Sequence, residues 1–380
     1  MRPVGRPLVK SFARRVPELL DVVGATPTVQ LRNLTRAGEA RLVAKLENTN
    51  PGGSLKDRPA WFIIRQAELD GLLPPGGTII ESSSGNFGLA LAMIGASRGY
   101  RVIAIVDPKL TATNRDLLEA FGAEIIVVDQ QDDSGSYHKT RIELANRLYR
   151  EIPGSFRPDQ CFNPSNSEAH YRSTARELTD QVGRNLAAVV CTVSTGGQLA
   201  GIARYVKERA PRVEIIGVDV EGSTVFGGEA HSYLTPGVGL SWTPANLDDL
   251  SLVDAVYMVT DEDAHLACRT LARTEGVLAG VSTGAALLVA LARAVRGRPE
   301  EQIAFLACDR GERYLATAFS HDWLCAHGLS TDRSVTELRR RAHDLAPRST
   351  NPARDCANYL PDLAYQLGSP SVVLARSEWR

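Results

Sequence analysis

The chain has 380 residues, 43% of them hydrophobic, and a formal net charge of -1. This length suffices for two domains with full cores, and the near-neutral charge gives no reason to expect nucleic acid or an anionic membrane as a partner. No apolar run is long enough to span a bilayer, and no signal-peptide h-region follows the basic N-terminus. The six cysteines are scattered without a Cys-x-x-Cys pair, which argues against a metal site or a disulfide framework and favours the cytoplasm.

Strand-like and helix-like segments alternate along most of the chain. A turn at 24–27 leads into a first strand, and a second strand at 41–47 ends at a glycine-rich turn. Further strands are predicted at 78–81, 101–106, 124–129, 187–193, 214–220, 256–259 and 303–307, and helices at 87–98, 113–121, 137–151, 167–182, 199–209, 261–275, 284–295 and 312–325. Because the strands are apolar throughout, they predict parallel sheets covered by helices on both faces. Such sheets bind ligands beyond the carboxyl ends of their strands.

The two ends of the chain differ from this pattern. Residues 1–17 are basic and patternless, which predicts a flexible N-terminal arm. Residues 331–380 are rich in Arg, Ser and Pro, with one predicted helix at 335–345. This C-terminal extension has no role that follows from its composition.

The turn at 50–58, Asn-Pro-Gly-Gly-Ser-Leu-Lys-Asp-Arg, places a lone lysine, Lys56, before a helix-like run. Pro59 suits the first turn of a helix, so Lys56 is expected at a helix N-terminus, whose positive end opposes an added proton. A lysine that loses its proton easily is a nucleophile that forms Schiff bases. An isolated lysine is ordinarily a solvated surface charge, and the other loops decide between the two interpretations.

Three more loops connect a predicted strand to a predicted helix, at 81–88 (Glu-Ser-Ser-Ser-Gly-Asn-Phe-Gly), 194–198 (Ser-Thr-Gly-Gly-Gln) and 280–284 (Gly-Val-Ser-Thr-Gly). Hydroxyls, glycines and free N–H groups at a helix start suit anions, although each loop alone reads equally well as a helix cap. A reactive lysine, a loop that binds phosphate and a loop that binds a carboxylate are together typical of a site for pyridoxal phosphate and an amino acid.

In this order, the four motifs resemble those of the cysteine synthase group of fold type II pyridoxal-phosphate enzymes, over roughly residues 20–325. The resemblance implies two three-layer α/β domains with mostly parallel sheets, as in the tryptophan synthase β-like fold. It implies a larger cofactor-binding domain from 18–49 plus 161–330, a smaller mobile domain at 50–160, and a homodimer.

The resemblance also implies a role for each motif residue. Lys56 would be the Schiff-base lysine and would move the Cα proton, and Asn86 would bond the 3′-oxygen of the cofactor. Ser282 would face the pyridine nitrogen, where a neutral hydroxyl favours β-elimination. The phosphate would be held by Ser194, Thr195, Gly196, Gly197 and Gln198, and the substrate by Ser83, Ser84, Gly85, Asn86, Phe87 and Gln160.

Some features depart from cysteine synthase. Phe87 stands where that enzyme usually carries a small threonine. The stretches at 106–109, 113–114, 140–142, 309–315 and 320–324 resemble the N-(2-amino-2-carboxyethyl)-L-glutamate synthases. Those enzymes use O-phospho-L-serine as donor and the amino group of L-glutamate as nucleophile, and their product leads to 2,3-diaminopropionate for siderophores or peptide antibiotics.

Anionic substrates of this kind need cations near the site. Arg310, at a predicted strand end, is the expected substrate contact, and Lys109, Arg115 and Arg141 are further candidates. The alternatives are a cysteine synthase that uses O-acetylserine or O-phosphoserine, a cystathionine β-synthase, and a catalytically silent relative that acts as a binding partner. The intact Lys56 speaks against the silent relative.

Overall fold

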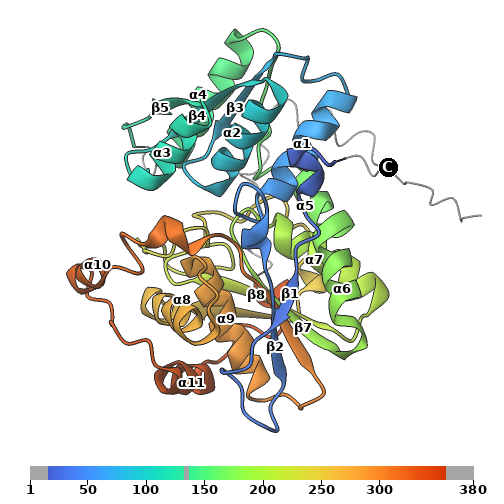
Figure 1. Cartoon of the computed structure of the whole chain (residues 1–380), viewed down its shortest axis with the longest axis vertical. Helices are drawn as coiled ribbons and strands as arrows, with labels where there is room; N and C mark the ends of the chain where they lie inside the picture. Colours follow the sequence, from blue (N-terminus) through green and yellow to red (C-terminus); the bar gives the residue numbers. More distant parts are fainter. Residues whose placement is uncertain (1–15, 132–136, 357–380) are drawn as a thin grey trace, which may run out of the picture.

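The computed structural model describes residues 16–131 and 137–356 and contains two separate, mostly parallel sheets (Figure 1). Most of the predicted N-terminal arm and the end of the C-terminal extension lie outside the described residues. The larger sheet has the strand order β1-β2-β10-β7-β8-β9, in which β1 alone is antiparallel to its neighbour. Its strands are β1 (Thr28–Gln30), β2 (Arg41–Lys45), β7 (Leu186–Thr192), β8 (Glu214–Val220), β9 (Ala255–Val259) and β10 (Gln302–Leu306).

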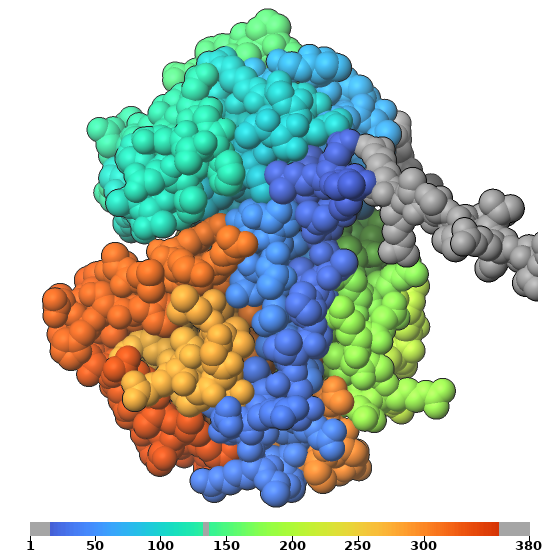
Figure 2. Space-filling view, viewed as in Figure 1, coloured from blue at the N-terminus to red at the C-terminus, as the bar shows by residue number. Residues whose placement is uncertain are grey.

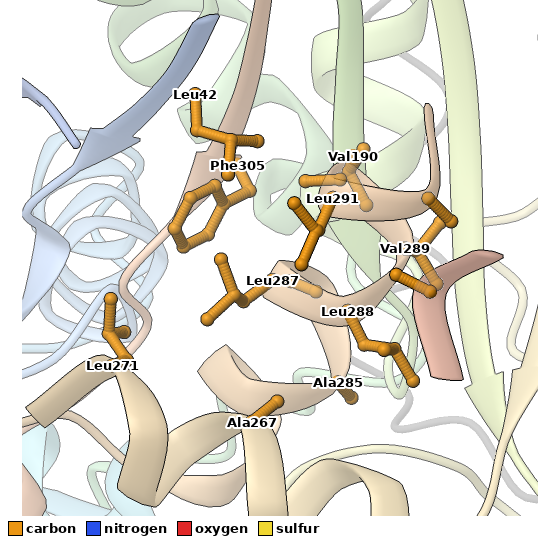
Figure 3. Close-up of a cluster of buried hydrophobic side chains, with 14 of the residues drawn as sticks. Leu42, Val190, Ala267, Leu271, Ala285, Leu287, Leu288, Val289, Leu291 and Phe305 are labelled. Carbon is orange, nitrogen blue, oxygen red and sulfur yellow. The ribbon is translucent and has the colours of Figure 1, made fainter. Parts of the chain in front are cut away.

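Helices cover both faces of the larger sheet, as the apolar strands predict. One face carries α8 (Asp261–Glu275), α9 (Val281–Ala294) and α11 (Val335–Asp344), and the other carries α6 (Arg176–Val182) and α7 (Gly197–Arg209). Neighbouring residues of β7 point to opposite faces, so that Val190 packs with the α9 cluster and Val189 with the α7 cluster. Figure 3 shows Leu287 and Leu291 of α9 turned toward Phe305 and Val190.

The smaller sheet is parallel throughout, with the order β5-β4-β3-β6. Its strands are β3 (Thr78–Ser82), β4 (Arg101–Val106), β5 (Glu124–Val127) and β6 (Ser155–Phe156), and its helices are α1 (Asp57–Leu69), α2 (Asn86–Arg98), α3 (Ala112–Ala120) and α4 (His138–Glu151). Ile79 of β3 packs with α1 and α2, whereas the next residue, Ile80, packs on the α4 side. The two sheets confirm the predicted fold class.

Three predictions about elements need correction. The helix predicted at 312–325 is wrong: a 3-10 turn, Gly311–Tyr314, is separated by turns from α10 (His321–Ala326). The Ser320 hydroxyl accepts a hydrogen bond from the backbone N–H of Trp323 at 3.3 Å, and this cap starts a new helix. The helix predicted at 167–182 is α5 (Ser165–Ala169), a π-helical stretch and α6. The short strand β6 lies in a predicted loop.

The described part of the C-terminal extension packs on the larger sheet. Leu338 of α11 is fully buried against α8 and α9. Arg341 forms ion pairs with Glu262 and Asp263 at 2.7 and 2.6 Å. The chain then pairs antiparallel with β9, where the Val256 N–H donates to the carbonyl of Ser349 at 2.9 Å.

The extension continues into a short last helix, α12 (Pro352–Asp355). The residue after this helix is the buried Cys356, whose thiol donates to the Phe226 carbonyl at 3.5 Å. This contact reaches the loop at 221–246, so the extension touches both a sheet edge and a connecting loop. Within the described residues no helix is both long and apolar enough to cross a bilayer.

Candidate active site

A cavity of about 580 Å³ lies at the carboxyl ends of the strands and is lined by residues from the parts of the chain that carry the two sheets. It is lined from one side by the loops after β3 and β4 and from the other by the loops after β7 and β8 and by α10. A narrower extension of about 30 Å³ shares Lys56, Asn86, Ser194, Thr195 and Gly237 with it. In the space-filling view the small-sheet part meets the large-sheet part along a seam (Figure 2).

Lys56 lies directly before α1 and lines both the cavity and its extension, as the sequence predicts. The preceding Leu55 donates its backbone N–H to the carbonyl of Cys308 at 2.8 Å, which ties the lysine turn to the end of β10. Gly53 takes a left-handed conformation with φ of +84°, which few other residues adopt. Burial lowers the pKa of Lys56, which favours the neutral amine that a base or nucleophile requires.

Asn86, the first residue of α2, is held by two groups from the segment after β10. Its Nδ2 donates to Asp309 Oδ2 at 2.7 Å, and its Oδ1 accepts from the guanidinium of Arg313. Tyr314 donates its hydroxyl to the same Asp309 oxygen. The amide orientation is therefore fixed, and one Nδ2 hydrogen is left for a ligand in the cavity.

The predicted carboxylate loop precedes α2. Ser83 Oγ accepts from the Gly88 N–H at 3.1 Å, and Gly85 is the N-cap residue of the helix. Ser83, Ser84, Gly85, Asn86 and Phe87 all line the cavity. Phe87 is 1% exposed and also packs in the core of the smaller sheet, so it forms a rigid part of the wall.

Arg141 of α4 reaches this loop. It donates to Ser84 Oγ at 2.8 Å and forms an ion pair with Asp107 at 2.8 Å. Its Nη2 also lies 3.0 Å from His138 Nδ1. Lys109 lines the same cavity, whereas Arg115 is not among the described residues that line it. Of these candidate cations, Arg141 is the buried one.

The predicted phosphate loop lines the narrow extension of the cavity. Gly196 has φ of +79°, and a Cβ on Gly197 would lie 2.2 Å from Asn166 Oδ1, so both positions require glycine. Ser194, Thr195, Gly196, Gln198 and Ser282 line the extension. The thirteen-residue helix α7 starts here, and its N–H groups favour an anion.

Among the described residues that line the cavity or its extension, Arg141, Gln160, Gln198 and Trp242 each have a buried side-chain atom without a hydrogen-bond partner. Gln198 Nε2 and Gln160 Oε1 are buried and have no hydrogen-bond partner within the described part of the chain. A buried polar atom without a partner is costly. With a lysine of lowered pKa, a phosphate cradle and the Ser282 hydroxyl, these groups fit pyridoxal phosphate and an amino-acid substrate.

The geometry does not support Arg310 as the cationic substrate contact. Its side chain is exposed and donates to the Asn48 carbonyl at 3.2 Å, and it is not among the described residues that line the cavity. Arg313, three residues later, lines the cavity and holds Asn86. The two side chains differ because the 3-10 turn at Gly311–Tyr314 directs Arg313 toward the cavity.

Several cavity residues had no signal in the sequence. They include Asp159, Cys161, Tyr233, Trp242 and His265, while Glu81, Tyr314 and Trp323 lie in stretches that the sequence singles out without giving these residues a role. Trp323 stacks between His265 and His327, with ring centroids 5.7 and 4.0 Å apart. Such walls arise from contacts between distant segments, so no local motif marks them. The described residues contain no cluster of three or more His, Cys, Asp or Glu that could hold a metal.

This fold and this site define a pyridoxal-phosphate enzyme of fold type II. The family model described as "Pyridoxal-phosphate dependent enzyme" matches residues 19–309. The chain belongs to that family, and pyridoxal phosphate is its cofactor.

Individual members of the family are similar to this chain over most of its length. The chain is 40% identical to the N-(2-amino-2-carboxyethyl)-L-glutamate synthase of Ralstonia nicotianae over 311 residues, 80% of this chain and 90% of the relative. It is 39% identical to the enzyme of that name from Cupriavidus metallidurans, over 84% of this chain and 94% of the relative. The O-acetylserine dependent cystathionine beta-synthase of Helicobacter pylori is a similar solved structure, with a TM-score of 0.73, 33% identity, and coverage of 80% of this chain and 98% of the other.

Proposed function

We propose that the protein joins O-phospho-L-serine and L-glutamate by β-replacement to give N-(2-amino-2-carboxyethyl)-L-glutamate and phosphate. The observation that carries this proposal is the buried guanidinium of Arg141, which contacts the Ser84 side chain in the cavity that also holds Lys56. This arrangement offers an acidic acceptor a cation beside the carboxylate loop. The two synthases that are about 40% identical to the chain carry the name of this reaction.

The bound cofactor supplies an electron sink for the Cα carbon of the donor. Lys56 would hold the cofactor covalently before the substrate arrives. The freed amine of Lys56 then accepts the Cα proton and later returns it. Burial supports this role because it lowers the pKa of Lys56 and keeps the amine neutral.

The remaining residues position the substrates. Ser83, Ser84 and Asn86, together with the side-chain amide of Gln160, whose N–H groups can donate, hold the donor carboxylate. Ser194 to Gln198, at the start of α7, would hold the phosphate of the cofactor, and Ser282, which lines the same extension, would hydrogen-bond its ring nitrogen. Gly85 and Phe87 shape the wall next to the donor.

Glutamate carries two carboxylates, and its amine must be neutral to attack. Arg141 is already paired with Asp107, so Lys109 provides the additional positive charge on that side of the cavity. Lys109 thus adds a positive side chain beside the Arg141–Asp107 ion pair, which suits a dicarboxylate better than a neutral or small nucleophile.

One assay series tests the reaction. The purified holoenzyme receives O-phospho-L-serine with glutamate, sulfide or homocysteine in separate reactions, and phosphate release and product mass are measured. Glutamate should give the diamino tricarboxylic product together with stoichiometric phosphate. Turnover with sulfide but none with glutamate would instead identify a cysteine synthase, and absence of any turnover or cofactor absorbance would favour the silent relative.

We also propose that the protein is a cytoplasmic homodimer with a larger domain, 18–49 plus 161–330, and a smaller mobile domain at 50–160. The six free cysteines support a reducing compartment. The separate sheets with a cavity between them support two domains. Light scattering of the purified protein tests the dimer, and small-angle scattering with and without L-serine tests closure of the smaller domain.

A further inference from the structure

Glu81 links two segments that lie far apart in the sequence. It is the next-to-last residue of β3, is 3% exposed and lines the cavity. Its Oε1 accepts from the backbone N–H of Ser82 at 2.9 Å, and its Oε2 accepts from the backbone N–H of Asp159 at 2.7 Å. One buried carboxylate therefore contacts the last residue of β3, from which the loop before Asn86 starts, and the turn before Gln160.

The Asp159 N–H needs this acceptor because the sheet ends before it. Strand β6 pairs with β3 only at Ser155 and Phe156, after which the chain leaves the sheet. Asp159 is 2% exposed, and a buried N–H without a partner is costly. The Glu81 carboxylate takes the place that a neighbouring strand would otherwise fill.

Asp159 sits in a turn that directs Gln160 toward the cavity. Its φ of +55° lies in the left-handed region, which is uncommon for a residue other than glycine. Its side chain is paired with Arg157 at 2.9 Å, and its carbonyl accepts from the N–H groups of Phe162 and Asn163. The adjacent Gln160 lines the cavity with its unpaired Oε1.

We propose that Glu81 is a positioning residue that holds the two halves of the substrate-carboxylate site, the Ser83–Asn86 loop and the Gln160 turn, in register with each other. The proposal rests on the proposed function, which assigns both halves to the donor carboxylate. Loss of either contact would let one half move relative to the other, and the donor would bind more weakly.

The ionisation of Glu81 gives this linkage a pH dependence. Its pKa is raised to about 7, chiefly by burial and also by the Asp159 carboxylate, against the Arg157 guanidinium and the two backbone N–H contacts, which lower it. Arg141 on α4 and the Cys161 thiol also lie within reach of its charge. A neutral carboxyl keeps one good acceptor oxygen, so both backbone contacts are at full strength only in the ionised form. Donor affinity therefore rises as the pH rises through about 7.

The test compares Glu81→Gln with a matched control, Asp219→Asn. Asp219 is also the next-to-last residue of its strand, is fully buried with a pKa raised to about 7, and accepts the N–H of Val220 at 2.8 Å, but it is not among the described residues that line the cavity. Two readouts are measured: hydrogen exchange of the peptide 157–163, and binding of L-serine to the holoenzyme from pH 6 to 8.5, followed by the absorbance of the cofactor.

In Glu81→Gln, exchange in 157–163 should accelerate at least about tenfold and L-serine should bind about tenfold more weakly, as for loss of a charge-assisted hydrogen bond. KM for O-phospho-L-serine should rise with kcat changed less than about threefold, and the rise of L-serine affinity near pH 7 should disappear. Asp219→Asn should leave all of these as in the wild type.

Unchanged exchange and unchanged L-serine affinity in Glu81→Gln would overturn the inference. Failure of the wild type to use glutamate would overturn the proposed function alone, because neither readout involves glutamate.

Discussion

Asn86 and Asp309, more than two hundred residues apart, are joined by a hydrogen bond of 2.7 Å between the start of α2 and the segment after β10. Because Asp309 accepts from Nδ2 and Arg313 donates to Oδ1, the amide of Asn86 has one defined orientation. Asp309→Ala should weaken cofactor binding about tenfold, since a hydrogen bond to a charged group contributes roughly 1.5–3 kcal/mol. Titration of cofactor-free protein with pyridoxal phosphate measures this. Tyr314→Phe, which keeps the Asn86 contact, should have a smaller effect; equal losses would show that the amide orientation is not the cause.

Lys56 should be the single site of covalent cofactor attachment. Borohydride reduction of the holoenzyme followed by peptide mass mapping should place the label on Lys56. Lys45 is an internal control, because it is also buried with a lowered pKa but is paired with Glu177 at 2.9 Å. Lys56→Ala should reduce turnover by at least about 10²-fold, the usual contribution of a positioned base. A label on Lys45 would refute the assignment.

Arg313 and Arg310 should behave differently although they are three residues apart. Arg313→Ala removes the guanidinium that donates a hydrogen bond to Asn86 Oδ1. This change should raise KM for O-phospho-L-serine about tenfold. Arg310→Ala removes an exposed side chain and should change KM less than about twofold. Steady-state kinetics of both variants decide this. The reverse order of effects would restore Arg310 as the substrate contact.

Arg141→Lys should affect glutamate more strongly than the serine substrate. The lysine keeps the charge but loses the planar guanidinium, whose Nη1 contacts Ser84 and Asp107 and whose Nη2 lies next to His138. KM for glutamate should rise about tenfold, whereas L-serine binding to the holoenzyme should change less than about threefold. A larger effect on L-serine than on glutamate would place Arg141 on the donor side of the cavity.

Three buried carboxyl groups should make stability fall as the pH rises. Burial raises the pKa values of Asp57, Glu81 and Asp219 to about 7, from 3.8 to 4.5 for exposed groups. Between about pH 4 and pH 7 the folded protein holds protons that the unfolded chain has released, so these groups lower the free energy of unfolding with increasing pH. Urea denaturation from pH 5 to pH 8 measures the decline. Asp219→Asn should flatten it, and an unchanged slope in that variant would contradict the assignment.

Much of the fold could be predicted because its signals are local. Apolar strands followed by amphipathic helices predicted the parallel sheets, and strand β4 and helix α8 have the predicted bounds. The four loops of the site were also visible, since each combines glycines and hydroxyls at a strand end. The domain boundaries and the roles of individual site residues stay predictions.

The errors come from contacts that no local pattern encodes. The side-chain cap of Ser320 interrupts a run that is apolar enough for one helix. Arg310 and Arg313 are equivalent in sequence, and only the turn between them decides which one enters the cavity. Glu81 looked like an ordinary strand residue, because its partner Asp159 is 78 positions away.

The pairing of Ser349 with Val256 has a consequence for solubility. Strand β9 ends the larger sheet, and an uncovered edge strand is a template for pairing with another chain. The C-terminal extension occupies part of this edge from within the same molecule. A chain cut short before residue 345 would expose these backbone groups, and its characteristic defect would be aggregation through edge-to-edge pairing.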